Sequence, residues 1–208
     1  MTDPIEEAAE ALARGQLVIF PTDTVYGLAA RPDDPAATER LFTAKGRSYD
    51  LPIPVLAGSL AAAHHVGEFD ERAELLAQAW PGPITLVLPR AAESYGWKIG
   101  GDGRTVAVRV PKHPLALALL ALSGPLAVTS ANRSGKPPLE DAEALTAEFD
   151  DDVAVYLCQD ARPAGVASTV VDLTRVEPLI LRVGAVSDAD VARFLAGEGP
   201  LLDSRPSP

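Results

Sequence analysis

Residues 17–28 read Leu-Val-Ile-Phe-Pro-Thr-Asp-Thr-Val-Tyr-Gly-Leu, an apolar run that is followed at once by a polar segment. The apolar run, Leu17 to Phe20, is typical of a strand that is buried on both faces of a sheet. Thr22, Asp23 and Thr24 come directly after it, where side chains of α/β proteins reach a ligand crevice. The same residues also fit a local turn whose side chains satisfy only their own backbone. The stretch therefore predicts a buried strand that ends at either a ligand site or a self-contained turn.

Helix and strand patterns alternate on both sides of this stretch. Capping residues such as Asp3 and Asp34 precede apolar-periodic segments, and glycines such as Gly15 end them. Helices are predicted over residues 4–14, 35–44, 60–66, 71–80, 115–122, 139–148 and 188–196. Strands are predicted over residues 17–20, 53–56, 84–88, 105–110, 126–129 and 153–157, with a hairpin over 168–173 and 179–183. The mixture predicts an α/β (α+β) fold with a mixed sheet in one domain, residues 1–197, before a mobile tail, residues 198–208.

The composition excludes several classes of protein. The 208-residue chain has 47% hydrophobic and 23% charged residues, as ordinary globular domains do, so disorder is excluded as its default state. One cysteine and three histidines exclude an internal disulfide and a multi-cysteine zinc site. A net charge of −11 argues against stable, sequence-blind binding of nucleic acid, which depends on an excess of cations. Without a secretory signal or an apolar stretch near the ~20 residues of a membrane span, we expect a cytoplasmic protein with no membrane partner.

Two further polar clusters follow predicted elements. Lys45 and Arg47 flank a glycine at a predicted helix end, where cations either complement the helix dipole or converge on a triphosphate. Ser130 and Asn132 follow the predicted strand 126–129, and they face the same side if the chain stays extended. Their side chains offer donors and acceptors to a nucleotide, while a simple Asn/Ser/Gly turn is the alternative.

Arg109 and Arg182 each lie inside an apolar, strand-like segment. A guanidinium group in such a setting needs an anion, either an internal carboxylate or a ligand. An internal pair is the ordinary explanation for one such arginine. For two of them, together with Lys45 and Arg47 in an acidic chain, we favour a shared anionic ligand.

Seven motifs occur in one order between Phe20 and Ser187. They are PTDTVYGL, FTAKGR, WPGPITLVL, VAVRVPKHP, TSANRSGKPP, STVVDLT and LILRVGAVS. With them the chain resembles the YrdC family of threonylcarbamoyl-AMP synthases over about four fifths of its length. The resemblance implies a YrdC-like twisted mixed β-sheet with flanking helices around a deep concave cavity that is lined with positive charge.

The resemblance also implies an activity. A nucleotidyltransferase of this family forms L-threonylcarbamoyl-AMP and pyrophosphate from ATP, L-threonine and bicarbonate or CO2. Mg2+ is expected to arrive on the ATP phosphates, with no metal ligand from the protein. The product feeds N6-threonylcarbamoyladenosine formation in tRNAs that read ANN codons, which a separate threonylcarbamoyl transferase complex completes. Contact of this chain with tRNA is expected to be transient at most.

The resemblance assigns roles residue by residue. Lys45 and Arg47 match the family's KxR pair, which handles ATP phosphates and the carbamate, and both are expected to be catalytic. The expected ATP contacts are Arg47, Thr105, Asn132 and Arg182. The expected threonine contacts are Thr24, Arg109, Ser130 and Ser168.

Four residues depart from the family's pattern. They are Ser48 in place of a proline, Leu51 and Leu56 where many members have Asn and His, and Glu140 where a small polar residue is common. The leucines keep open the alternative of a paralogue that acts on a different carbamoyl-adenylate. A second alternative is an RNA-binding module of the same fold, against which the net charge argues. A purely structural role leaves the polar clusters at the strand ends unexplained.

Overall fold

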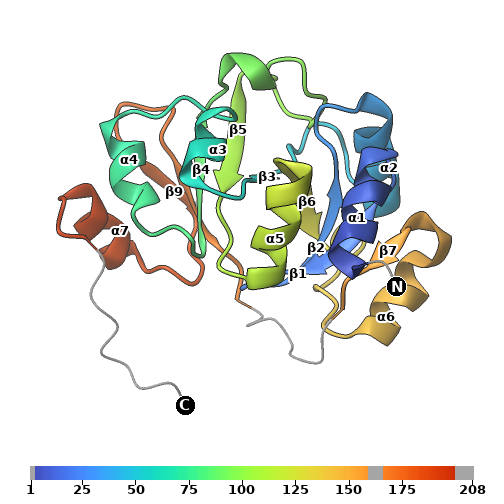
Figure 1. Cartoon of the computed structure of the whole chain (residues 1–208). Coiled ribbons are helices and arrows are strands. Elements are labelled where there is room, and N and C mark those ends of the chain that lie inside the picture. Colours follow the sequence, from blue (N-terminus) through green and yellow to red (C-terminus); the bar gives the residue numbers. More distant parts are fainter. Residues whose placement is uncertain (1–2, 159–165, 200–208) are drawn as a thin grey trace.

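One twisted mixed sheet runs through the part of the chain that the structure describes, residues 3–158 and 166–199 of a computed structural model (Figure 1). Within these residues nine strands pair in the order β7-β1-β2-β6-β3-β5-β4-β8-β9. The strands are β1 (Val18–Pro21), β2 (Tyr26–Ala30), β3 (Val55–Leu56), β4 (Ile84–Pro89), β5 (Thr105–Arg109), β6 (Leu126–Ser130), β7 (Val155–Tyr156), β8 (Thr169–Asp172) and β9 (Leu179–Arg182). Parallel and antiparallel pairs both occur, so the predicted mixed sheet is confirmed.

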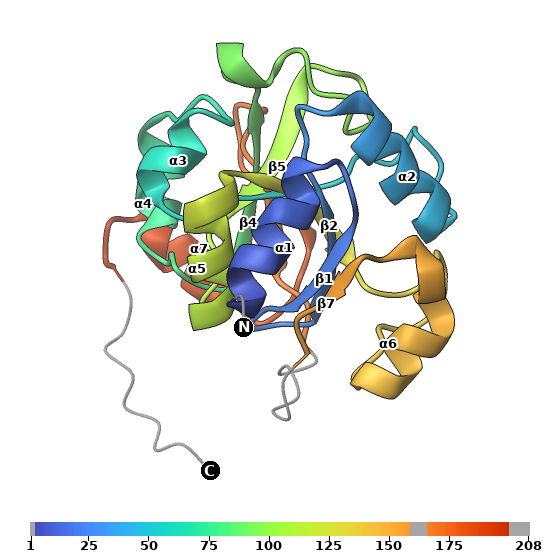
Figure 2. The same cartoon turned by 45° about the vertical axis from the view of Figure 1, so that its right-hand side comes forward.

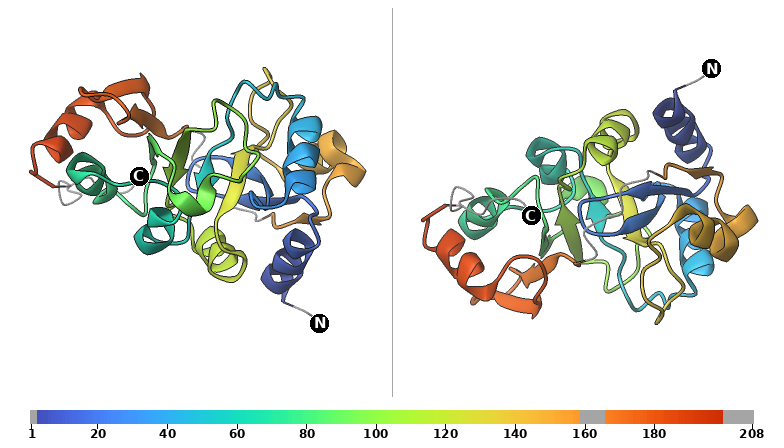
Figure 3. Two further views of the ribbon diagram at one scale, coloured as in Figure 1. Left: turned by 90° about the horizontal axis from the view of Figure 1, so that it is seen from above. Right: turned by 90° about the horizontal axis from the view of Figure 1, so that it is seen from below.

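Helices cover both faces of this sheet. They are α1 (Pro4–Ala13), α2 (Pro35–Lys45), α3 (Leu60–His64), α4 (Glu71–Ala77), α5 (Pro114–Ser123), α6 (Ala142–Phe149) and α7 (Asp188–Leu195), with 3-10 turns η1 (Ala92–Ser94) and η2 (Asp150–Asp152). Figures 1 and 2 show α1 and α5 side by side on one face. Figure 3 shows α2 and α6 at one end of the sheet and α4 and α7 at the other. Among the described residues no helix is long and apolar enough to cross a bilayer.

The strand predicted over residues 17–20 is buried on both faces. Val18 and Phe20 pack into an apolar cluster with α1 and α5, whereas Leu17 and Ile19 pack into the larger cluster that includes α2, α4 and α7. Because neither face of β1 meets water, all four residues of the run are apolar and do not alternate with polar residues.

The sequence prediction missed β2. Residues 26–28 were interpreted only as part of the polar segment and residues 29–30 were assigned to no element, yet residues 26–30 pair antiparallel with β1, with Phe20 opposite Gly27, and with β6 on the other side. Tyr-Gly-Leu-Ala-Ala has no β-branched residue, so its own propensity for a strand is weak. The close approach of its neighbours explains the glycine: a Cβ on Gly27 would lie 2.6 Å from Val128 Cγ1.

Most predicted boundaries are confirmed within a few residues. The Asp34 carboxylate accepts from the backbone N–H of Ala36 at 2.9 Å, and Ser59, Asp70 and Ser187 cap their helices in the same way. The predicted start of the helix at residue 139 was wrong, because Asp141 caps α6 and the helix begins at Ala142. The hairpin of β8 and β9 is confirmed. Most of the predicted tail, from residue 200 on, lies outside the described residues.

Candidate active site

A cavity of about 280 Å³ lies where β1, β5, β6 and β9 end and where β2, β4 and β8 begin. Hydroxyl and guanidinium groups interrupt an otherwise apolar lining. The lining residues are Thr22, Thr24, Val25, Gly27, Arg47, Pro54, Leu56, Thr85, Arg109, Val128, Thr129, Ser130, Pro138, Ala167, Ser168 and Arg182. Among the described residues, none that lines the cavity carries a carboxylate. The polar segments that follow the strands therefore do converge on one hollow of positive charge.

Lys45 is the last residue of α2, and its ammonium group turns toward the loop after β6. Gly46 ends the helix in the left-handed conformation (φ 63°). The Lys45 Nζ donates to the Ser130 carbonyl (2.6 Å), to Ser130 Oγ (3.2 Å) and to Asn132 Oδ1 (2.7 Å). Burial, and then repulsion from Arg47, lower the pKa of Lys45 to about 8. Ser130 and Asn132 thus face one side, as predicted, and Lys45 lies on that side.

Arg47 lies one residue beyond this turn and lines the cavity. Its Nε donates to the Leu51 carbonyl and its Nη2 to the Pro52 carbonyl, both at 2.9 Å. These bonds hold the guanidinium plane without neutralising its charge. Burial lowers the pKa of Arg47, but an arginine remains charged at neutral pH.

Arg109 is held by three neighbours at the end of β5. Its Nε donates to the Gly82 carbonyl (2.9 Å), its Nη1 to Thr24 Oγ1 (3.0 Å) and its Nη2 to Asp23 Oδ1 (2.5 Å). The Asp23 carboxylate also accepts from the backbone N–H of Lys112. Burial lowers the pKa of Arg109, and the attraction of Asp23 opposes that shift. The internal ion pair that is ordinary for one buried arginine is therefore present here.

The segment after β1 forms the predicted turn and also lines the cavity with Thr22 and Thr24, whose role as a ligand site stays a prediction. Thr22 forms the self-contained turn, because its Oγ1 accepts from the backbone N–H groups of Thr24 and Val25 and donates to the Val25 carbonyl. Thr24 and Asp23 instead face Arg109 across the cavity wall. The turn thus presents the side chains that hold the cation.

Arg182 lies across the cavity at the end of β9. Its Nε and Nη2 donate to the Ser168 carbonyl at 3.1 and 2.9 Å, and its Nη2 reaches Ser168 Oγ at 3.2 Å. Ser168 Oγ lies 2.8 Å from Thr85 Oγ1. Among the described residues, no carboxylate forms an ion pair with Arg182, Arg47 or Lys45. These three cations provide an excess charge that fits a polyanionic ligand.

Thr105 is not brought together with the other predicted residues. It begins β5, four residues before Arg109, and at ~3.3 Å per residue the two lie roughly 13 Å apart. It does not line the cavity, and its hydroxyl contacts Asp102 at 3.4 Å. Its assignment to ATP stays a prediction.

Sequence reasoning missed other residues of the site. Thr85 was not proposed as a ligand contact, yet it lines the cavity, and so does Leu56, which the sequence marked only as a departure from the family's pattern near threonine. Thr85 is the one hydroxyl inside the run Ile-Thr-Leu-Val-Leu, which is a signal that could have been used. Leu56 is the direct sheet neighbour of Arg109, whereas Leu51 is exposed and contributes only its carbonyl to Arg47.

The residues that line the cavity also indicate which ligands Mg2+, the metal expected with ATP, would have at this site. Mg2+ prefers oxygen ligands and is held in proteins by one or two carboxylates together with substrate phosphates. The described lining offers hydroxyls and no carboxylate. This donor set fits a metal that arrives on a triphosphate and does not fit one that the protein holds by itself.

Comparisons with known proteins agree with this geometry. The family model Sua5/YciO/YrdC, described as "Telomere recombination", matches residues 10–184. A Mycobacterium tuberculosis protein provisionally named threonylcarbamoyl-AMP synthase is 43% identical over 95% of this chain and 92% of its own length. The threonylcarbamoyl-AMP synthase of Pyrococcus abyssi is 41% identical over 92% of this chain and 57% of its own.

A solved structure shows the same fold. The crystal structure of P. abyssi Sua5 complexed with L-threonine has a TM-score of 0.83 and 37% identity, over 96% of this chain and 59% of that one. The family model covers most of the chain, and the mycobacterial relative matches nearly all of it. The chain therefore belongs to the Sua5/YciO/YrdC family.

Proposed function

We propose that this chain is an L-threonylcarbamoyladenylate synthase. The observation that carries the proposal is the division of charge at the cavity. Among the described residues, no carboxylate pairs with Arg47 and Arg182, which line the cavity, or with Lys45, which bonds to the lining residue Ser130, whereas Arg109 is paired with Asp23. Cations without a carboxylate partner can balance the negative charge of a triphosphate. Arg109, whose charge Asp23 already balances, suits a small zwitterion with no net charge, such as an amino acid. Relatives of 41–43% identity that carry the synthase name support the same conclusion.

The reaction joins an amine, a one-carbon acid and a nucleotide. The threonine amine forms a bond to the carbon of bicarbonate, which loses water, or to the carbon of CO2, in which case the nitrogen releases a proton to solvent. Either route leaves a carbamate. A carbamate oxygen then attacks the α-phosphorus of ATP, and the bond to pyrophosphate breaks. Neither step needs a nucleophile from the protein, so positioning and charge stabilisation supply the catalysis.

The side chains of the cavity divide these tasks. Arg109, oriented by Thr24, is placed to bind the threonine carboxylate, and Ser168 is placed to contact the amino acid from the other wall. Arg47 and Arg182 are placed to stabilise charge on the α-phosphate and the departing pyrophosphate. Mg2+ that is bound to ATP would supply further neutralisation of the pyrophosphate.

Lys45 and Asn132 complete the nucleotide side of the site. They lie directly behind Ser130, which lines the cavity, and hydrogen bonds to Lys45 connect the three. We assign Asn132 to ATP and Ser130 to threonine.

The product is an acyl-adenylate, which suits a subsequent acyl transfer. We propose that a separate transferase complex uses it to form N6-threonylcarbamoyladenosine in tRNAs that read ANN codons. This would place the enzyme in the cytoplasm, with tRNA as at most a transient contact.

The decisive measurement is pyrophosphate release from ATP and bicarbonate with each amino acid in turn. We expect release only with L-threonine, and release that also requires bicarbonate. ATP binding without threonine-dependent release would contradict the synthase and favour a paralogue for another carbamoyl-adenylate.

One observation favours that paralogue enough to name its test. Leu56 gives the wall beside Arg109 an aliphatic surface. Release that is faster with a more apolar amino acid than with threonine, and that reverts in Leu56→His, would assign the specificity to this residue.

A further inference from the structure

Arg133 lies in the loop after β6, between Asn132 and Ser134, and its guanidinium contacts two separate elements. One donor reaches the carbonyl of Ala44 in the last turn of α2. The others reach α6 and the turn after it: Nε donates to Glu148 Oε1 (3.0 Å), and Nη2 donates to the Glu148 carbonyl (2.8 Å) and to Asp152 (3.3 Å). The cation also lies 5.2 Å from the centre of the Phe149 ring.

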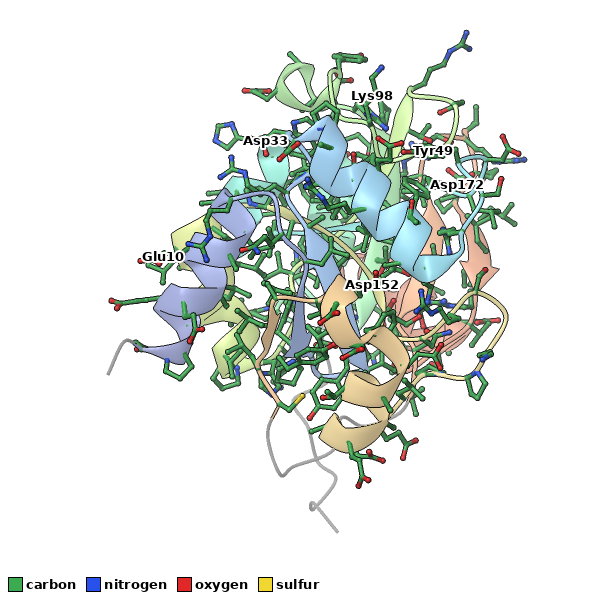
Figure 4. The ribbon with its side chains drawn as sticks, turned by 90° about the vertical axis from the view of Figure 1, so that its right-hand side faces the viewer. Glu10, Asp33, Tyr49, Lys98, Asp152 and Asp172 are labelled. Atoms are coloured by element: carbon green, nitrogen blue, oxygen red, sulfur yellow. The ribbon has the colours of Figure 1, made fainter. Side chains whose placement is uncertain are left out.

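These contacts surround the nucleotide side of the candidate site. Ala44 directly precedes Lys45, and the backbone N–H of Ser134 donates to the Lys45 carbonyl at 2.8 Å. Lys45 in turn donates to Ser130 and Asn132. The loop and the helix end thus hold each other, and Arg133 is the side chain that ties both to α6. Asp152, labelled in Figure 4, lies on the side of α6 that faces α2.

The loop needs such an anchor. Residues 131–141 contain no helix or strand, so the sheet alone does not determine where Asn132 lies. Arg133 does not line the cavity, and nothing on the cavity wall requires its charge. Its planar fork reaches a carbonyl on one element and a carboxylate on another at once, which the single ammonium of a lysine does less well.

We propose that Arg133 is a positioning residue, which keeps Lys45 and Asn132 in register for the nucleotide by joining the end of α2 to α6. Removal of its guanidinium would leave the loop with only the longer, more exposed ion pair of Lys136 with Glu148 (3.9 Å) among its described charged links to α6, and it would loosen the three hydrogen bonds of Lys45. The residues assigned to threonine should keep their places, because other contacts hold Thr24, Arg109 and Ser168, and Ser130 is held in β6 by its pairing with β2. The inference rests on the proposed function only for the identity of the nucleotide.

The test compares Arg133→Ala, Arg133→Lys and Glu148→Gln with the unsubstituted protein. We expect Arg133→Ala to raise the Kd for ATP, measured by calorimetry without threonine, roughly tenfold, as the loss of one well-placed contact does. The KM for threonine should stay within about twofold, and Glu148→Gln should act in the same direction but less. The effects of Arg133→Ala and Glu148→Gln on the Kd should be clearly less than additive, because both changes weaken the Arg133–Glu148 connection, while the ion pair of Glu148 with Lys136 is lost only in Glu148→Gln.

A second readout does not depend on ATP or on activity. Lys45 is 3% exposed, so an amine-reactive reagent followed by mass spectrometry should modify it slowly, and at least about fivefold faster in Arg133→Ala. Arg133→Lys should restore most of the protection. If the unsubstituted protein shows no threonine-dependent pyrophosphate release, the proposed function fails while the protection of Lys45 still decides the role of Arg133.

Arg72→Ala is the matched control. Like Arg133, which donates to two carbonyls and two carboxylates, Arg72 joins separate segments: it donates to the carbonyls of Leu173, Arg175 and Val176 and pairs with Asp70, away from Lys45. It should lower stability without changing the Kd for ATP or the labelling of Lys45. Two results would overturn the proposal. The first is a Kd for ATP and a labelling rate of Lys45 in Arg133→Ala that both stay within twofold of the unsubstituted protein. The second is a change in Arg72→Ala as large as that in Arg133→Ala. If Arg133→Ala does not fold, the Kd for ATP and the labelling rate of Lys45 are measured in Arg133→Lys and Glu148→Gln instead. Unchanged values in Glu148→Gln would then overturn the proposal.

Discussion

At the scale of single residues, the site depends on which cations have partners. Arg109 is buried with Asp23 beside it, whereas Lys45 is buried among neutral oxygens. A buried cation without a carboxylate favours its neutral form, and a buried ion pair is destabilised strongly when one partner is removed. Two predictions follow from this difference, one on pH and one on stability.

The first concerns the charge of Lys45. Its pKa of about 8 lies below the ordinary lysine value of 10.5, so the ammonium form is present below pH 8 and is lost as the pH rises through that value. If that charge binds phosphate, kcat/KM for ATP should fall above about pH 8, well before an ordinary lysine titrates. Lys45→Arg should remove this inflection, and Lys45→Ala should lower kcat on the order of 10²-fold.

The control separates the enzyme from its substrates. The amine of threonine also titrates at alkaline pH, but an inflection that comes from threonine would persist in Lys45→Arg. An identical pH profile for Lys45→Arg and the unsubstituted protein would show that Lys45 does not act through its charge.

The second residue-scale prediction compares two aspartates that make similar contacts in different surroundings. Asp23 pairs with Arg109 inside the protein, with side chains 14% and 6% exposed, whereas Asp33 pairs with Arg31 at the surface, 47% and 36% exposed. Both pairs have an N–O distance of 2.5 Å. Asp23→Asn should lower the free energy of unfolding by about 3 kcal/mol, since it leaves a buried charge unpaired. Asp33→Asn should cost at most about 1 kcal/mol. Urea unfolding at neutral pH measures both, and equal losses would refute the argument.

At the scale of elements, local signals predicted local structure. Asp34, Ser59, Asp70 and Ser187 cap the helices expected of them, because a cap needs only a side chain and the next turn of backbone. β2 could not be predicted in this way, since its pairing with β1 and β6 outweighs its weak propensity. The candidate site likewise combines contacts that local spacing predicts with contacts that only the fold brings about.

Sequence spacing did place Ser130 and Asn132 together, although the segment is not extended as that prediction assumed: β6 ends at Ser130, and the backbone N–H of Asn132 donates to the Ser130 carbonyl at 2.9 Å. Spacing did put Thr105 and Arg109 near opposite ends of the predicted strand 105–110, but it could not show that the cavity lies at the Arg109 end only. Nor could it find Asp23 as the partner of Arg109, since the two residues are 86 positions apart and only the fold joins them.

The element-scale prediction concerns the packing of β2 against β6. Gly27→Ala would place a Cβ 2.6 Å from Val128 Cγ1 in the middle of the sheet. We expect a loss of about 1–3 kcal/mol in the free energy of unfolding, the usual cost of overpacking a core. In a Val128→Ala background the conflicting methyl group is gone, so Gly27→Ala should cost clearly less there. A double-mutant cycle by urea unfolding measures this, and strict additivity would contradict the proposed contact.

At the scale of the whole molecule, net charge and local charge have opposite signs. The chain carries −11 overall, yet the described lining of the cavity has arginines and no carboxylates. Acidic groups elsewhere repel a long polyanion, while a compact triphosphate that enters the cavity meets only its cations. The molecule is therefore suited to a small anionic ligand and is poorly suited to a nucleic-acid backbone.

This distinction leads to a prediction for tRNA. Non-specific nucleic-acid binders reach a Kd of about 10⁻⁴ to 10⁻⁶ M at physiological salt through many phosphate contacts, and their affinity falls steeply as salt rises. We expect no retarded tRNA band below about 100 µM protein at physiological salt, whether or not ATP and threonine are present. A basic RNA-binding protein of similar size serves as the positive control in the same gel. A band at micromolar protein that disappears between about 50 and 200 mM salt would instead show that this acidic chain has a phosphate-binding surface, and it would restore the RNA-binding alternative.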